Sequence, residues 1–432
     1  MSFNPKVTVI MTSYNKPELI GIAIKSVLDQ SLKDFELLIM DDNSNMETIN
    51  IIKEFLNDPR VTLYKSDIKD EDRYKKTRYA TLINQALELA KGEYISYITD
   101  DNMYKKNRLD LMSYLLNTNK EVNIVYSAQK LIHLNENYQP ISSVTRKTEG
   151  VLNKAAEVVD HCSVMHRKSI LDDIKKKYGN YWDDDKKYWG YADAIFWNRL
   201  NEKHLFYPTL MVLDYNYRTP RSYKVMHFGL PSFEGGECFI PNGTIVKDNS
   251  TNIYYFDDGK RRLIKDPKIF NLLQFTSSDI IQVPDPILFK YTLGKEITNS
   301  NLKKSIPNDI LIKSDDNDQI YYIQKGKKRP IQGALHFYGF KMNKVITLPK
   351  QIVRSISNGP ALIGVVKKGE ILPNRLIIKI EHQYYLVLDN CLHLIGSLDI
   401  FEKLKLNRED SLIGSKEWLQ WFNIGPNIVY EW

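Results

Sequence analysis

The sequence is poor in cysteine and has no long apolar run. Its 432 residues include only three cysteines, Cys162, Cys238 and Cys391, which are too few and too scattered for a disulfide framework and lack the CxxC spacing of a zinc site. No run of about 18 apolar residues occurs, and residues 1–6 lead into a strand-like segment rather than a signal peptide. We therefore expect no transmembrane segment and a cytoplasmic location.

A glycine-rich phosphate loop and a strong charge imbalance are also missing. The loop after the first apolar run, residues 12–16, contains no G-x-G-x-x-G, which argues against a dinucleotide oxidoreductase and a nucleotidyltransferase. The 60 basic and 53 acidic residues give a net charge of +7. This mild excess fits either a solvated surface or attraction of an anionic ligand such as a nucleoside diphosphate, and we expect no nucleic-acid partner.

The composition is that of a globular protein with more than one core. Apolar residues make up 43% and charged residues 26% of the chain, which is enough to bury real cores and argues against disorder. Because domains cluster at roughly 100–200 residues, the length predicts two or three domains.

Short apolar runs alternate with helical periodicity over residues 6–128, which is typical of βα units around a mostly parallel sheet. The predicted strands span residues 7–11, 35–40, 61–64, 94–98 and 123–128. Asn15 is predicted to cap the first helix and Pro17 to lie in its first turn. In such sheets ligands bind where strands end, so the residues after each strand are the first candidates for a site.

From about residue 243 the pattern changes to hairpin-like alternation that repeats. Residues 253–264 recur as residues 320–331, an offset of 67 residues, and a degraded third copy begins at residue 383. Each copy is predicted to form a strand, a turn with glycine for positive φ, a strand and a short helix. The predicted domains are 1–225, a linker 226–242 rich in Gly, Pro and Ser, and a module 243–432 of three repeats of about 66 residues.

Acidic residues directly follow two of the predicted strands. Asp41 and Asp42 end the second strand, and Asp100 and Asp101 end the strand 94–98. Neighbouring carboxylates repel each other unless a cation neutralises them, so a divalent metal with a diphosphate explains both clusters. Helix caps and Asx-turns are the structural alternative.

These segments carry a resemblance to a known family. Residues 7–15, 26–30, 35–44 and 97–102 resemble the GT-A inverting glycosyltransferases of family 2. Residues 76–79, 160–167, 181–182 and 193–197 are more similar to the spore-coat polysaccharide glycosyltransferases of endospore-forming bacteria, and the two-part layout also resembles their spore-maturation glycosyltransferase-like proteins. The resemblance implies an α/β GT-A domain, Rossmann-like with a mostly parallel sheet, followed by a smaller β-rich α+β repeat module.

The resemblance also implies a nucleotide site. Thr12 and Tyr14 would line the pocket for the base, and Asp42 would accept a hydrogen bond from a pyrimidine N3–H. Arg73 would help to hold the nucleotide, and Asp100 would contact the ribose. The donor implied is a UDP- or dTDP-sugar.

Further residues are assigned to catalysis by the same resemblance. Asp101 would coordinate the Mn²⁺ or Mg²⁺ that bridges the diphosphate, and Asp193 would be the general base. Asp160 and His161 would belong to the donor or acceptor pocket. General chemistry agrees, because sugar transfer needs a neutralised leaving group and a base for the acceptor hydroxyl.

Structural alternatives exist for several of these residues. Asp193 would also serve as a helix cap, and Cys162 and His166 would be either metal ligands or ordinary core residues. The basic residues 73–78 suit either phosphate binding or a solvated surface.

The sequence thus predicts an inverting glycosyltransferase that moves a sugar to a glycan or other hydroxyl acceptor in spore-surface polysaccharide synthesis. The competing hypothesis is a catalytically silent protein that binds glycans or builds the spore surface on the same scaffold.

Overall fold

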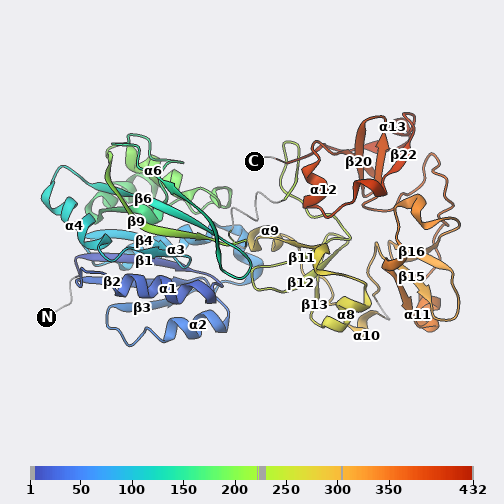
Figure 1. Cartoon of the computed structure of the whole chain (residues 1–432), viewed down its shortest axis with the longest axis horizontal. Helices are drawn as coiled ribbons and strands as arrows, with labels where there is room; N and C mark the ends of the chain where they lie inside the picture. The colour runs from blue at the N-terminus through green and yellow to red at the C-terminus, as the bar shows by residue number, and fades with distance from the viewer. Residues whose placement is uncertain (1–4, 221, 223–229, 303–304, 431–432) are drawn as a thin grey trace. The chain divides into compact units, whose positions relative to one another are not determined.

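The computed structural model describes residues 5–220, 222, 230–302 and 305–430. The chain divides into two compact units, Met1–Ser222 and Tyr223–Trp432, whose elements are labelled in Figure 1. Across the described ranges, no helix combines the length and apolarity that crossing a bilayer requires.

The first unit is built on a nine-stranded sheet with the strand order β3-β2-β1-β4-β8-β6-β9-β5, and β7 pairs with β6. The strands are β1 (Val7–Ser13), β2 (Phe35–Asp41), β3 (Val61–Lys65), β4 (Tyr94–Thr99), β5 (Asn102–Tyr104), β6 (Ile124–Leu134), β7 (Pro140–Arg146), β8 (Val164–Arg167) and β9 (Phe206–Arg218). Strands β3, β2, β1 and β4 are parallel. Antiparallel pairing of β8 with β4 and β6 makes the rest of the sheet mixed.

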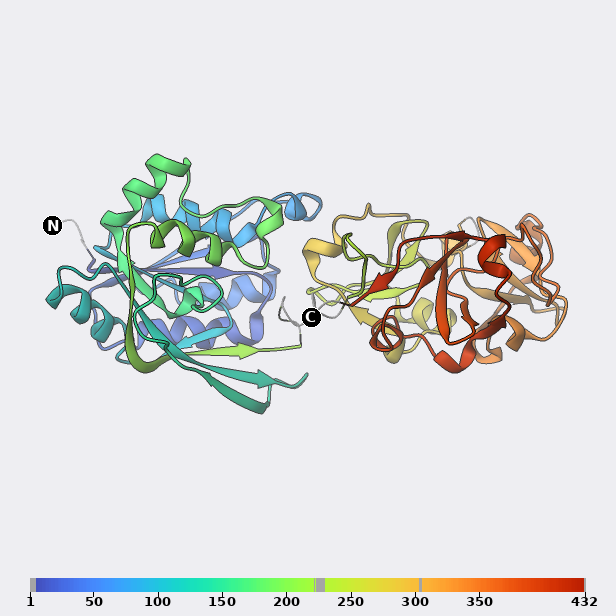
Figure 2. The ribbon, with the colours of Figure 1, turned by 90° about the horizontal axis from the view of Figure 1, so that it is seen from above.

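Helices cover both faces of this sheet (Figure 2). One face carries α1 (Pro17–Leu28), α2 (Met46–Lys53) and α4 (Arg108–Thr118), and the other carries α3 (Arg78–Leu89), α5 (Leu171–Tyr178) and α6 (Ala192–Asn201). Val9 and Met11 of β1 pack with the first group, while Ile10 packs with the second. Burial on both sides explains why the strand is a continuous apolar run, as its sequence predicted.

The prediction that Asn15 caps the first helix is wrong. Pro17 is the first residue of α1 and Lys16 is its N-cap residue, without a side-chain cap. Asn15 has φ 51°, and its Oδ1 accepts a hydrogen bond of 2.7 Å from the Asn45 N–H at the start of α2. The left-handed backbone turns the side chain toward the neighbouring loop, so Asn15 links the loops that follow β1 and β2.

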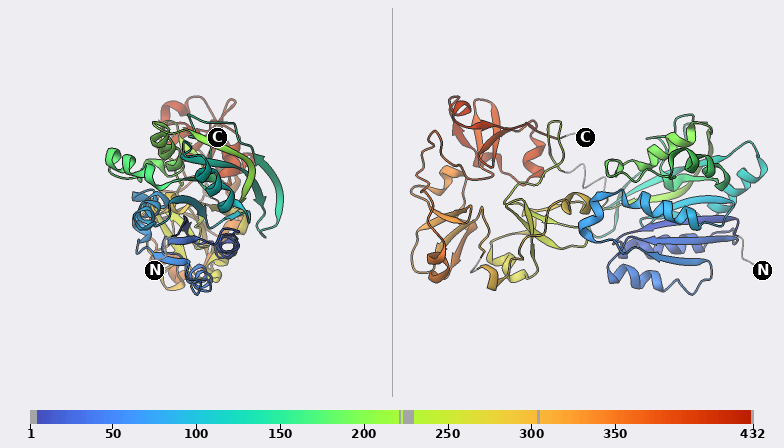
Figure 3. Two further views of the ribbon diagram at one scale, coloured as in Figure 1. Left: turned by 90° about the vertical axis from the view of Figure 1, so that its left-hand side faces the viewer. Right: turned by 180° about the vertical axis from the view of Figure 1, so that it is seen from behind.

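The second unit contains three small sheets of the same strand order. The first is made of β11 (Ile245–Lys247), β12 (Ile253–Asp257), β13 (Lys260–Ile264) and β14 (Ile280–Gln282); the second of β15 (Leu311–Ser314), β16 (Ile320–Gln324), β17 (Lys327–Pro330) and β18 (Val345–Leu348); the third of β19 (Ile377–Ile380), β20 (Gln383–Leu388), β21 (Cys391–Leu394), β22 (Leu412–Gly414) and β23 (Asn423–Ile424). They appear in yellow, orange and red in Figure 3.

Short helices follow the hairpins, as the sequence predicted, and contain Phe270, Phe337 and Phe401. They are α8 (Pro267–Leu272), the 3₁₀ helix η6 (Leu335–Tyr338) and α12 (Asp399–Lys403), with α9 (Asp285–Leu288), α10 (Asn299–Leu302), α11 (Lys350–Ser355) and α13 (Trp418–Trp421) elsewhere in the unit. Sequence patterns had not indicated the fourth strand of each sheet, β14, β18 or β22, which pairs in parallel with the first.

Each of the three copies shares a core with both of the others. One core joins the first copy to the third, a second joins the first to the second, and the last joins the second to the third. The ends of the unit also meet, since β10 (Ser232–Phe233) pairs with β24 (Ile428–Val429). Mutual packing therefore closes the array into a ring rather than an open stack.

The linker predicted over residues 226–242 lies partly outside the described residues, which resume at 230. Its described part contains β10 and buries Leu230, Phe239 and Ile240 in the core shared by the first and third copies. These residues therefore pack within the second unit.

Candidate active site

The carboxyl ends of β1, β2 and β4 lie side by side. Thr12, only 8% exposed, stands opposite Met40 of β2 and Thr99 of β4. In the loops just beyond, the Tyr14 N–H donates a hydrogen bond of 2.7 Å to Asp100 Oδ2. The structure therefore brings the residues predicted after separate strands to one edge of the sheet.

Asp42 is held at this edge by two buried arginines. Arg73 Nη1 lies 2.5 Å from its Oδ2, and Arg78 Nη2 lies 2.7 Å from its Oδ1. The Arg73 guanidinium also covers the ring of Tyr14 at 4.1 Å from the ring centroid. Arg78 Nε also donates to Oδ1 at 3.1 Å and, over a longer distance of 3.4 Å, to Oδ2. A carboxylate offers about four lone-pair sites, so a further donor to Asp42 would replace the long contact at Oδ2.

The other basic residues of the segment are not part of the edge. Lys75 pairs with Asp72, and Lys76 pairs with Asp184, and both lysine side chains are more than half exposed. The phosphate-binding alternative for residues 73–78 therefore applies to the two arginines alone.

We expect Asp42→Asn to destabilise the first unit by about 3–5 kcal/mol, because the buried Arg78 guanidinium loses the anion it pairs with and Arg73 keeps only the largely exposed Asp70. Asp173→Asn is the matched control, since Asp173 pairs with Lys203 where both side chains are about 60% exposed, and its replacement should leave the stability nearly unchanged. The free energy of unfolding of both variants can be measured by urea titration, with hydrogen exchange followed in peptides of the first unit. Equal effects would contradict the assigned role of the arginines.

Asp100 and Asp101 form a pair of adjacent carboxyl groups beside Lys16. Burial and, less strongly, the charge of Asp101 raise the pKa of Asp100 to about 7, although Lys16 lowers it. Lys16 Nζ lies 2.7 Å from Asp101 Oδ2, and the Thr99 hydroxyl donates to Asp101 Oδ1 at 2.6 Å. A divalent cation here would favour the ionised form of both carboxyl groups.

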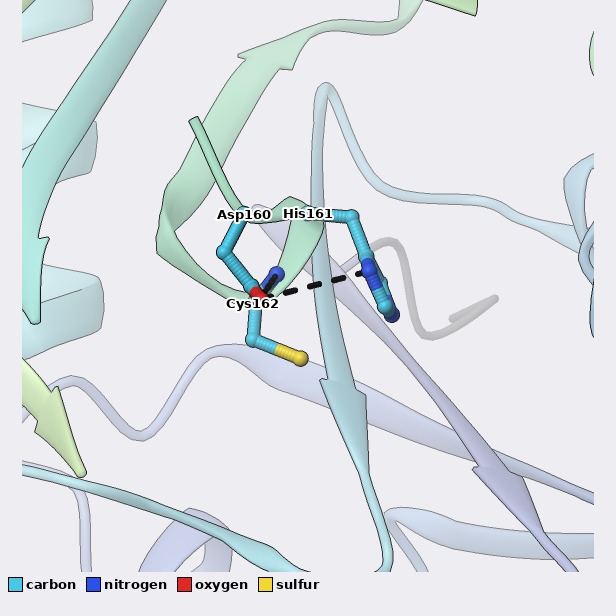
Figure 4. Close-up of side chains that lie close together, drawn as sticks. All are labelled: Asp160, His161 and Cys162. Atoms are coloured by element: carbon cyan, nitrogen blue, oxygen red, sulfur yellow. Dashed lines mark hydrogen bonds and ion pairs between the residues drawn. The ribbon is translucent and has the colours of Figure 1, made fainter. Parts of the chain in front are cut away.

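A second cluster is tied to this edge through Cys162. The 3₁₀ helix η2 (His161–Ser163) directly precedes β8, the neighbour of β4, and Asp160 caps it by accepting from the Cys162 N–H at 3.0 Å. Cys162 Sγ in turn contacts Thr99 Oγ1 at 3.8 Å. Figure 4 shows Asp160, His161 and Cys162 in this turn.

His161 connects this turn with Asp193. Its Nδ1 lies 3.8 Å from Asp193 Oδ2 and 4.0 Å from Asp160 Oδ1. Burial works against the charged imidazolium, yet the pKa of His161 is raised. Cys162 is the largest cause that raises the pKa of His161, ahead of Asp193 and Asp160. Burial raises the pKa of the Cys162 thiol itself to about 11. Nε2 of His161 is buried with no hydrogen-bond partner in the described part of the chain.

Asp193 lies in the first turn of α6, whose N-cap residue is Tyr191. Its Oδ1 accepts from the Ala194 N–H at 2.9 Å, while Oδ2 faces His161, and the side chain is 22% exposed. Asp193 is therefore not the N-cap residue that the structural alternative expects. One of its oxygens binds the adjacent N–H of the first turn, and the other is directed toward His161.

Aromatic rings surround His161. Tyr79 stacks on it at a centroid distance of 6.1 Å, and Trp182 meets it edge-on at 5.8 Å. The Tyr79 hydroxyl accepts from the Ala192 N–H at 2.9 Å. Because Tyr79 follows Arg78 in α3, one helix start contacts both the Asp42 side and the Asp193 side of the site.

Asp160, His161 and Cys162 could also hold a metal, since one ligand atom from each lies within 4.8 Å of the others. Two features argue against it. The Cys162 thiol favours its protonated form, and Arg146 Nη1 lies 3.6 Å from Asp160 Oδ2, where it repels a cation. His166 is fully buried, with Nε2 at 2.7 Å from the Tyr97 hydroxyl, and is therefore a core residue.

Sequence reasoning missed three basic residues of the site. Lys16 contacts Asp101, as described above. Arg146 is the last residue of β7 and Arg218 the last residue of β9. The pKa of Arg218 is lowered, because burial and the charge of Arg146 outweigh the opposite effect of Asp160 and Asp101. Two like charges beside the two acidic clusters suit an anion such as a diphosphate. Their position at strand ends is the signal that could have found them.

The fold and the strand-end carboxylates define a GT-A type domain of the kind that binds sugar nucleotides. Residues 8–174 match Glycosyl transferase family 2. Protein CgeD of Bacillus subtilis (strain 168) is 42% identical over 396 residues, which are 90% of this chain and 88% of CgeD. The chain belongs to glycosyl transferase family 2.

Other relatives match a smaller part of the chain. Poly(ribitol-phosphate) beta-N-acetylglucosaminyltransferase TarP of Staphylococcus aureus (strain N315) is 34% identical over 123 residues, 27% of this chain and 35% of TarP. A structure of S. aureus TarS in complex with UDP has a TM-score of 0.38 at 17% identity, and covers 51% of this chain and 63% of that one. The chain thus spans less than two thirds of TarP and of the TarS chain.

Proposed function

We propose that the chain is an inverting glycosyltransferase that moves a sugar from a UDP- or dTDP-sugar to a hydroxyl group of a glycan. The observation that carries the proposal is the chain of contacts from Asp101 through Thr99, Cys162 and His161 to Asp193. The proposal is supported because these contacts join Asp101, a carboxylate suited to the leaving group, to Asp193, a carboxylate suited to the acceptor.

The nucleotide binds where β1, β2 and β4 end. Tyr14, with the Arg73 guanidinium on its ring, offers a flat surface for the base. Asp42, fixed by Arg73 and Arg78, accepts from the N3–H of uracil or thymine, and Thr12 borders the same pocket. Asp100, whose Oδ2 is oriented by the Tyr14 N–H, contacts the ribose.

A Mn²⁺ or Mg²⁺ ion bound by Asp101 would neutralise the charge that develops on the leaving diphosphate. The residues fit such an ion, because Asp100 and Asp101 are adjacent carboxylates beside Lys16, and hard divalent cations favour carboxylate oxygens. Arg146 and Arg218 bind the diphosphate from the side of β7 and β9.

Asp193 takes the proton of the acceptor hydroxyl. Its Oδ1 is engaged by the Ala194 N–H, and Oδ2 is oriented by His161. Asp160 Oδ1 lies 4.0 Å from the same ring nitrogen, Nδ1, and Tyr79 and Trp182 fix the plane of the imidazole. Removal of the proton as the anomeric carbon is attacked gives a single displacement and inverts its configuration.

Calorimetry with nucleoside diphosphates tests the donor site. UDP or dTDP should bind at least about tenfold more tightly than GDP or ADP, because a purine lacks the pyrimidine N3–H that Asp42 accepts. A chelator should weaken the binding of the diphosphates and leave that of uridine unchanged. Equal binding of GDP and UDP, or diphosphate binding that ignores the chelator, would exclude this assignment.

The biological setting proposed is the synthesis of spore-surface polysaccharide from the cytoplasmic side. Its support is the resemblance of residues 160–167 and 193–197 to spore-coat polysaccharide enzymes and the extensive match to a Bacillus subtilis protein.

The two units should have separable roles. We expect residues 1–225 to fold alone and bind UDP with the affinity of the full chain, while residues 243–432 determine acceptor choice or localisation. Expression of the first segment, with circular dichroism and UDP titration, checks this. An insoluble segment, or a folded one that does not bind UDP, would refute the proposed boundary.

A further inference from the structure

The ring of three repeats encloses a cavity of about 320 Å³ that is lined by all three copies. Its size falls at the lower end of the roughly 300–1,000 Å³ typical of ligand sites. Every residue lining it belongs to the second unit, so it is separate from the glycosyltransferase edge described above.

The floor of the cavity is formed by one equivalent position in each copy. Gly243, Asp309 and Arg375 follow one another at intervals of 66 residues, and all have left-handed backbones with φ of 78°, 60° and 59°. A Cβ atom on Gly243 would lie 3.2 Å from Asp309 Cβ and 3.4 Å from Arg375 Cδ, so the three positions converge. Glycine suits this conformation, and the two charged residues adopt it at a cost in strain that often marks a functional position.

The two charged residues of the floor are fixed in different ways. Asp309 accepts from the Tyr322 hydroxyl at 2.6 Å and from Asn374 Nδ2 at 3.2 Å. Arg375 donates to the carbonyl oxygens of Gly243 and Leu404 at 2.6 and 2.8 Å. Within the described ranges no carboxylate lies at ion-pair distance from Arg375, so its charge is available to a bound anion.

The wall presents flat apolar surface. Phe275, Phe340 and Leu406 occupy equivalent positions in the three copies and line the cavity. Both phenylalanines are partly exposed, and Phe340 stacks on Tyr322 at 5.1 Å. An aromatic face beside fixed polar groups matches a sugar ring, which has one apolar face and polar edges.

The rim carries two ion pairs, Lys344 with Asp279 and Lys341 with Asp410, each at 2.7 Å. These charges cancel. Among the remaining lining charges, Arg375 and the exposed Lys405 outnumber the single carboxyl group of Asp309. The lining therefore favours an anionic ligand.

We propose that this cavity binds a sugar unit that carries a carboxylate, such as a uronate of an acidic glycan. The carboxylate lies toward Arg375 and Lys405, and the ring packs on Phe340. The repeat unit would thereby hold an acidic polysaccharide that the first unit extends or decorates.

Saturation-transfer NMR on the full chain with D-glucuronate, D-glucose and acetate tests the proposal. Glucose lacks the carboxylate and acetate lacks the ring, so glucuronate should bind at least about tenfold more tightly than either. Excess UDP should not displace it, since UDP occupies the other unit. The proposal would be overturned if glucose or acetate bound as tightly as glucuronate, if glucuronate gave no saturation-transfer signal, or if UDP displaced glucuronate. Displacement by UDP would show that glucuronate binds at the glycosyltransferase site instead.

Substitutions that copy one repeat into another locate the site with little disturbance of the fold. Arg375→Gly introduces the residue of the first copy, and Lys405→Gln copies Gln274, which has the same left-handed backbone. Both should weaken glucuronate binding by about tenfold or more. Lys325→Gln is the control, because Lys325 shares that backbone but lies outside this cavity. If Arg375→Gly fails to fold, glucuronate binding by Lys405→Gln tests the proposal by itself. A folded variant that binds glucuronate as tightly as the original chain would exclude the cavity as the site.

Discussion

Asp193→Asn lowers sugar transfer by a factor on the order of 10²–10⁴ and leaves donor binding unchanged. The amide is nearly isosteric with the carboxylate but cannot take a proton at neutral pH. Since Asp193 Oδ2 faces His161 and not the Asp42 edge, the nucleotide contacts should persist. Transfer assays and UDP titration on the same preparation measure the two effects separately.

Asp172→Asn controls for the helix start. Asp172 lies in the first turn of α5, where it is exposed, so its replacement removes a similar interaction with the helix dipole, worth about 0.3–1 kcal/mol, without touching the site. We expect transfer to be unaffected. Near-normal transfer by Asp193→Asn would reduce Asp193 to a residue of the helix start and make Asp160 the next candidate base, whereas loss of folding would support a structural role.

Asp101→Asn should weaken metal-dependent donor binding roughly 10–100-fold, an effect seen even for residues that only support metal ligands, and reduce turnover at least as much. The substitution removes one anionic ligand from a hard cation. Binding and turnover thus fall together here, whereas Asp193→Asn separates them. Titration of UDP with and without Mn²⁺ gives the metal-dependent part.

Lys16→Met is the companion variant, because the Lys16 ammonium competes for Asp101 Oδ2 at 2.7 Å. Without it, Mn²⁺ should bind more tightly to the protein with UDP. If Asp101→Asn left the Mn²⁺ dependence intact, the Asp160, His161 and Cys162 group would become the better metal site.

The order of elements in the first unit was predictable because each follows from local patterning. The run at residues 7–11 is apolar on both faces of β1, and Asp42 and Asp101 stand directly after strands. The pairing of β8 with β4 was not predictable, because it joins segments far apart in the sequence. That pairing brings Cys162 to Thr99, so the relation between Asp101 and Asp193 came only from the structure and the family resemblance.

In the second unit, the hairpins were visible as repeated tyrosines and turn glycines. The closure of the ring was not, since it depends on contacts between the first and third copies. The charged floor was also hidden, because the alignment of Gly243, Asp309 and Arg375 places three unlike residues at one position. Only the shared left-handed backbone marks them as equivalent.

The most direct test of the central claim is the release of nucleoside diphosphate from sugar nucleotides by the purified full chain. With Mn²⁺ present, we expect UDP or dTDP to be released from at least one UDP- or dTDP-sugar, and release to stop with a chelator and to fall in Asp101→Asn. A catalytically silent scaffold would release no nucleoside diphosphate from any sugar nucleotide with either metal, and that result would contradict the account.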